Sequence, residues 1–94
     1  MEKLQKLALM DKVLRELDDL KNSQTSILKK LSQIEADNIN LGAGVLDDKL
    51  PDIHEEVDSG IAIISELFEQ LTEERNKFYS DNKLDSLEDP TAKS

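Results

Sequence analysis

The chain of 94 residues has no cysteine and no tryptophan, and it contains one histidine, two prolines and three glycines. Without cysteine there is no disulfide framework, no thiolate ligand for zinc and no thiol nucleophile. One histidine is too few for a His-rich metal site, and no glycine-rich phosphate loop is present. We therefore expect a protein that is not an enzyme, with no catalytic residues, no cofactor and no metal.

Long apolar runs are also missing, since the longest, Leu7–Met10 and Ile61–Ile64, hold four residues each. A membrane-spanning helix needs about 20 apolar residues. We therefore expect no membrane insertion and a cytoplasmic location. The formal net charge of -9 repels nucleic acid, so we expect no nucleic-acid partner. Because we expect no catalytic site, we also expect no small-molecule substrate.

The negative charge is concentrated in the second half of the chain. Residues 1–47 carry 7 basic and 8 acidic side chains, whereas residues 48–94 carry 5 basic and 13 acidic ones. The sequence leaves two interpretations open, a solvated helix face or a docking surface for a basic partner. The densest acidic patch comprises Asp47, Asp48, Asp52, Glu55, Glu56 and Asp58.

Apolar residues in the first half follow a heptad pattern, which is typical of a helix that packs along one face. Three neighbouring heptad positions are apolar, with Lys21 and Gln24 as polar interruptions. The weak helix formers at residues 22–26 could break the helix, but the phase is the same on both sides of them. The pattern therefore predicts one helix over about residues 3–38.

The second half has a cleaner repeat, with an apolar residue at every seventh position from Leu50 to Phe78. A second row begins at Leu46 and forms the other half of the predicted seam. It includes Gly60, which either lets a partner helix approach closely, the interpretation we prefer, or marks a bend. Pro51 is suited to the first position of a helix. We therefore predict a turn at about 39–49, a helix at about 51–80 and a flexible acidic tail at 81–94.

These patterns predict an all-α fold, an antiparallel hairpin of two long helices over residues 1–80. The apolar stripes are wider than the two positions in seven that a two-stranded seam needs, and a hairpin alone buries little surface. We therefore expect a coiled coil or four-helix bundle formed with partner chains. The predicted partner-binding residues are Leu14, Leu17, Leu28, Leu31, Val57, Ile61, Ile64, Leu67, Phe68 and Leu71.

Ser23-Gln24 is followed by an apolar stripe, a short break, and Pro51 leading into a second stripe. In this plan, over about residues 20–78, the chain resembles the snapin-like small coiled-coil subunits of eukaryotic tethering and adaptor complexes. The resemblance implies a helical subunit that binds sister subunits along its length without catalysis. The stripe residues that carry it are Leu28, Leu31, Ile34, Val57, Ile61, Ile64, Leu67 and Leu71.

Two functions follow from the sequence as hypotheses. In the first, the chain is a structural coiled-coil subunit of a multi-protein complex that assembles with itself or with sister subunits. In the alternative, it is a small acidic regulator, inhibitor or chaperone, bacterial or phage-encoded among other sources, that binds a basic site on another protein. Salt separates the two, because docking of the acidic patch weakens steeply with ionic strength and apolar assembly does not.

Overall fold

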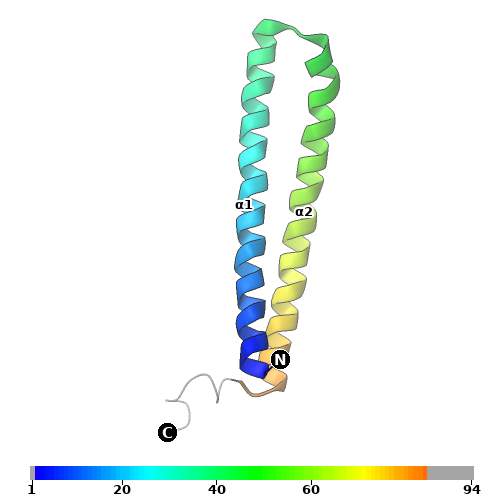
Figure 1. Cartoon of the computed structure of the whole chain (residues 1–94). Helices are drawn as coiled ribbons and strands as arrows, with labels where there is room; N and C mark the ends of the chain where they lie inside the picture. Colours follow the sequence, from blue (N-terminus) through cyan, green and yellow to red (C-terminus); the bar gives the residue numbers. More distant parts are fainter. Residues whose placement is uncertain (1, 85–94) are drawn as a thin grey trace. The chain divides into compact units, whose positions relative to one another are not determined.

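The computed structural model describes residues 2–84, and these form two helices, α1 (Lys3–Leu41) and α2 (Gly44–Asp81). The described residues contain no strand. The two helices pack as a helical hairpin, which confirms the predicted fold class (Figure 1). Neither helix is both long enough and apolar enough to cross a membrane.

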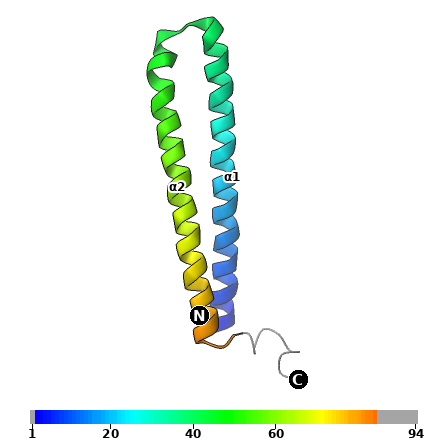
Figure 2. The same ribbon diagram turned by 180° about the vertical axis from the view of Figure 1, so that it is seen from behind.

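The chain divides into two compact units. The terminal unit holds residues 1–18 and 66–94, and the turn unit holds residues 19–65. Within each unit, a segment of α1 lies beside an antiparallel segment of α2, as both views show (Figures 1 and 2). Each unit is therefore a pair of helical segments with its own contacts.

The first helix continues through residues 22–26, as the unbroken heptad phase predicts. Two hydroxyl groups in this stretch bond back to the backbone one turn earlier. Thr25 Oγ1 donates to the carbonyl of Lys21, and Ser26 Oγ donates to the carbonyl of Asn22, each at 3.1 Å. Such back-bonding satisfies the side chain without interrupting the helix, which explains why these weak helix formers are tolerated.

The turn is much shorter than the predicted residues 39–49, because only Gly42 and Ala43 separate the helices. Asn38 is the reason that so short a connection is stable. Its Oδ1 accepts a hydrogen bond from the Ala43 N–H at 2.8 Å, and its Nδ2 donates to Asp47 Oδ1 at 2.7 Å. Asn38 is therefore buried without an unmet polar group, and it joins the end of α1 to the start of α2.

The sequence predicts that α2 begins at Pro51, but Pro51 lies inside the helix. The helix instead begins at Gly44, where the carbonyl of Ala43 accepts from the N–H groups of Leu46 and Asp47. At this position Pro51 removes the hydrogen bond to the carbonyl of Asp47, and its ring crowds that carbonyl, which is the usual cost of a proline inside a helix. Asp47 also lies in the first turn, where its charge complements the helix dipole.

The last described residues close α2 at its C-terminal end. Lys83 has a φ of 53°, and the N–H of Leu84 donates to the carbonyl of Tyr79 at 3.1 Å. This geometry is a Schellman motif, which commonly places an apolar residue after the left-handed one. Leu84 is fully buried. Of the predicted flexible tail, residues 81–84 therefore form the end of the helix and this cap, and residues 85–94 lie outside the described residues.

The packed side of α1 follows the predicted heptad positions. Leu7, Leu31 and Asn38 are buried, and the intervening seam positions are half-buried except Lys21, which is exposed. Gln24 is half-buried. The two polar residues therefore do not form a shared internal layer, because Lys21 extends into solvent.

The packed side of α2 differs from the predicted one. Leu50 is buried, and Val57, Ile64, Leu71 and Phe78 are half-buried, as is the row that contains Ile61 and Phe68. The row from Leu46, which we expected to face the first helix, instead includes exposed Ile53 and Leu67. A Cβ added at Gly60 in that row would have no atom within 4 Å. The first helix therefore does not approach Gly60 closely.

The left-handed conformation at the end of α1 generates a stability prediction. Gly42 has a φ of 64°, which an L-residue adopts at a cost of about 1 kcal/mol or more. We expect Gly42→Ala to lower the free energy of unfolding by about that amount. The matched Gly44→Ala variant, at a glycine with no such φ, should cause no loss; equal losses in urea unfolding would contradict the assignment.

The buried amide of Asn38 generates a second prediction. Asn38→Ala removes the partner of the Ala43 N–H and of the Asp47 carboxylate, which should lower the free energy of unfolding by about 1–3 kcal/mol. Asn40 is exposed, so Asn40→Ala serves as the control and should change it by less than about 0.5 kcal/mol. The measurement is urea unfolding followed by circular dichroism. Similar values for both variants would show that the turn does not depend on Asn38.

Candidate interaction surface

One row of apolar residues on α1 is left open to solvent in the turn unit. Leu20, Ile27 and Ile34 are 46, 41 and 42 % exposed. Their spacing of seven places them on one line along the helix. Each follows a packed seam residue by three positions, so the row borders the seam directly.

A matching row on α2 contains Ile53 and Gly60. Ile53 is 45 % exposed, and it follows the buried Leu50 by three positions, as Ile34 follows Leu31. In an antiparallel pair of right-handed helices, rows displaced from the seam by the same steps lie on the same side of the pair. The two rows therefore form one surface, which we call the apolar face, composed of Leu20, Ile27, Ile34, Ile53 and Gly60.

The terminal unit has its own exposed apolar residues. Val13 and Leu67 are 36 and 46 % exposed. An open hollow of about 550 Å³ lies beside Val13. Its apolar lining indicates a place for an apolar side chain rather than for a polar substrate. The lining residues are Lys6, Leu9, Met10, Val13 and Leu71.

Most predicted partner-binding residues lie on the packed sides of the helices. Leu31 is buried and the others are half-buried, with the exception of the exposed Leu67. Their role in binding a partner stays a prediction. The residues that sequence reasoning missed are those of the apolar face, although the wide stripe of α1 was a signal for its row of Leu20, Ile27 and Ile34.

The predicted acidic patch does not act as one set of equivalent charges. Asp47 accepts the hydrogen bond from Asn38, and an oxygen of Asp58 lies 3.3 Å from His54 Nε2. Glu35 Oε1 lies 3.3 Å from the other nitrogen of the same ring. Asp48, Asp52, Glu55 and Glu56 are exposed on α2. In residues 2–84, no three His, Cys, Asp or Glu side chains gather as metal ligands would.

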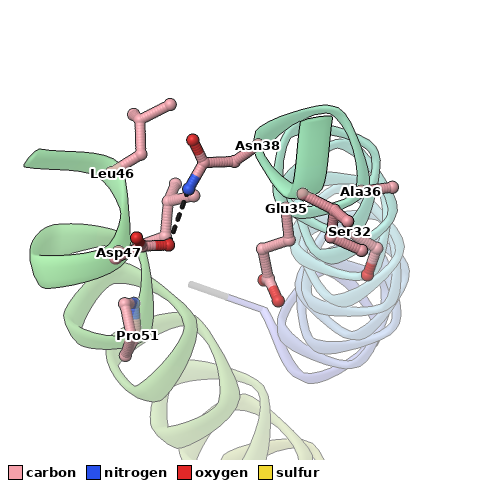
Figure 3. A pocket seen from close by; sticks show the side chains of 9 residues that line it. Ser32, Glu35, Ala36, Asn38, Leu46, Asp47 and Pro51 are labelled. Atoms are coloured by element: carbon pink, nitrogen blue, oxygen red, sulfur yellow. Dashed lines mark hydrogen bonds between the residues drawn. The ribbon is translucent and has the colours of Figure 1, made fainter. Parts of the chain in front are cut away.

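A second hollow in the turn unit lies beside the Asn38–Asp47 hydrogen bond (Figure 3). It is open and has a volume of about 470 Å³. Asn38 and Asp47 satisfy one another, and Pro51 and Leu50 supply apolar walls. The other lining residues are Ser32, Glu35, Ala36, Ile39 and Leu46.

The chain matches no protein-family model, no curated protein and no solved structure. The resemblance to snapin-like subunits therefore stays a prediction that rests on the sequence pattern.

An ion pair in the terminal unit ties α1 to α2. Arg75 Nε donates to Asp11 Oδ1 at 2.8 Å, and a terminal guanidinium nitrogen lies 3.4 Å from Oδ2. The guanidinium carbon also lies 4.9 Å from the centre of the Tyr79 ring. Both charged side chains are partly buried, so the pair helps to fix the register of the two segments.

This ion pair generates a third prediction. A double-mutant cycle with Asp11→Asn and Arg75→Gln should give a coupling energy of about 1 kcal/mol, at the upper end for a partly exposed pair. The measurement is the free energy of unfolding of both single variants and the double variant. Asp18 is exposed one heptad further along α1, and the control cycle of Asp18→Asn with Arg75→Gln should give a coupling near zero. Equal coupling in both cycles would contradict the assignment.

Proposed function

We propose that the protein is a non-enzymatic structural subunit, a helical hairpin that assembles with itself or with other helical chains. The observation that carries this proposal is the apolar face, on which Leu20, Ile27 and Ile34 are each more than two-fifths exposed beside Ile53. Contiguous exposed apolar surface with polar borders marks interaction sites in soluble proteins. A cytoplasmic location and a role like that of snapin-like subunits are part of the proposal.

The small amount of buried surface supports the proposal. Among residues 2–84, the buried apolar side chains are Leu7, Leu31, Leu50 and Leu84. Burial of one large apolar side chain contributes about 1.5–3 kcal/mol, whereas ordering the backbone costs about 1–2 kcal/mol per residue. A hairpin with so small a core gains stability when a partner covers its apolar face.

The acidic regulator remains the less favoured function. Asp47 and Asp58 already have partners within the chain, which leaves the exposed acids of α2 to attract a basic protein. Salt dependence distinguishes the two functions, because a complex held by exposed charges weakens steeply as ionic strength rises.

The test of the proposed function is recovery of partner chains. Tagged wild type, Ile34→Glu and Gln33→Glu would be isolated from the native cells, and retained chains quantified by mass spectrometry. Ile34→Glu places a charge on the apolar face, where an unpaired charge is costly to bury. Gln33 is exposed beside it but points away from the face, so Gln33→Glu is the matched control.

We expect wild type and Gln33→Glu to retain the same chain in a fixed ratio, either a second copy or another helical protein. Ile34→Glu should retain at least tenfold less, and raising the salt concentration should not release the retained chain. Equal recovery with all three proteins, or release by moderate salt, would contradict assembly through the apolar face.

A further inference from the structure

The apolar face has a charged border on each helix. Lys30 follows Ile27 by three positions and precedes Ile34 by four, whereas the buried Leu31 follows Ile27 by four. Lys30 and Leu31 therefore lie on opposite edges of the exposed row, with Leu31 toward α2 and Lys30 on the outer edge. One heptad further, Asp37 takes the same outer position beside Ile34.

The outer border of α2 carries the same order of charges along the chain, which the antiparallel packing reverses in space. Glu56 follows Ile53 by three positions, and Lys49 precedes Ile53 by four. Val57, which is half-buried, lies on the other edge of the same row. Along the chain, the outer edge of α1 thus carries Lys30 followed by Asp37, and the outer edge of α2 carries Lys49 followed by Glu56. All four side chains are exposed.

Two contacts fix which residues of the helices lie at the same level in the turn unit. Glu35 contacts His54, and Asn38 contacts Asp47. Because the helices are antiparallel, each step back along α1 corresponds to one step forward along α2. Counting from these contacts places Asp37 level with about residues 48–52 and Lys30 level with about residues 55–59. Asp37 is therefore level with Lys49, and Lys30 with Glu56.

We propose that a second copy of this chain covers the apolar face, with both turns at the same end and a twofold axis parallel to the helices. This proposal rests on the proposed function and names the partner. Rotation about that axis keeps every residue at its own level and sets α1 of one copy beside α2 of the other. Lys30 then meets the partner's Glu56, and Asp37 meets the partner's Lys49.

The charge pattern and the extent of the apolar face together favour this arrangement over the reversed one. A twofold axis across the middle of the face would set α1 against α1, with the turns at opposite ends. With that axis at Ile27, Lys30 would lie level with residue 24 of the partner and would find no opposite charge there. An axis midway between Lys30 and Asp37 would pair opposite charges, but it would set Leu20 beyond the end of the partner's α1 at Leu41 and leave part of the row uncovered. In the proposed arrangement both pairs have opposite charges and each occurs twice, as an isologous interface requires. Opposite charges at such borders determine orientation more than affinity.

The first arm of the test is the molecular mass of the purified chain by sedimentation equilibrium. Wild type should form a dimer, Gln33→Glu should do the same, and Ile34→Glu should raise the dissociation constant at least tenfold. Salt should not weaken the dimer, since each copy carries a net charge of -9 whose repulsion is screened at higher ionic strength.

The second arm tests orientation with single thiols, which are unambiguous because the chain has no cysteine. Lys30→Cys and Glu56→Cys proteins would be mixed and treated with a short bismaleimide. We expect the covalent dimer to consist mainly of Lys30→Cys joined to Glu56→Cys, well above the share from random pairing. Gln33→Cys, on the outward side of α1, should crosslink to Glu56→Cys at least tenfold less.

A third arm exchanges the border charges. Lys30→Glu should weaken the dimer about three- to tenfold, because it places like charges opposite each other at two sites. Adding Glu56→Lys to it should restore the dissociation constant to near the wild-type value. Additive weakening by the two substitutions would contradict the pairing of Lys30 with the partner's Glu56.

A monomeric wild type at all concentrations would overturn the proposed dimer, and dominant crosslinking of Lys30→Cys to itself would overturn its orientation. In either case the proposed function stands if Ile34→Glu still loses a different partner chain in the recovery experiment. If wild type is monomeric and recovery is the same with and without Ile34→Glu, the proposed function fails as well.

Discussion

The packing of one long helix against another is the interaction on which the rest of this molecule depends. Two helices share only a narrow seam, since two positions in seven suffice to fill it. Few large side chains can therefore be buried, and Leu31 and Leu50 are the buried apolar ones in the turn unit. The apolar residues left beside the seam are a direct consequence of this geometry.

Much of the fold could be predicted because periodicity depends on the sequence alone. The heptad phase that is the same on both sides of residues 22–26 correctly predicts a continuous α1. The short turn could not be predicted, because it depends on Asn38, whose two side-chain hydrogen bonds reach Ala43 and Asp47. An asparagine near a helix end indicates a turn, but its partners are defined only once the chain has folded back.

The packed side of α2 was the other feature beyond the reach of the pattern. An apolar stripe wider than the seam can face its neighbour through either edge, and periodicity does not distinguish them. The partly buried Arg75, paired with Asp11, extends the same row as Phe68 and indicates which edge is packed. Charge was misleading as a signal for that row, because a cation paired across the seam resembles a solvated residue in the sequence.

The central claim is that folding of this hairpin is completed by association. The most direct test is the thermal midpoint of the helical circular dichroism signal, measured over a hundredfold range of chain concentration. Coupled folding and association predict a midpoint that rises steadily with concentration, because mass action stabilises the assembled state. A cooperative transition with a midpoint independent of concentration would show that the hairpin is stable alone, which would contradict the account.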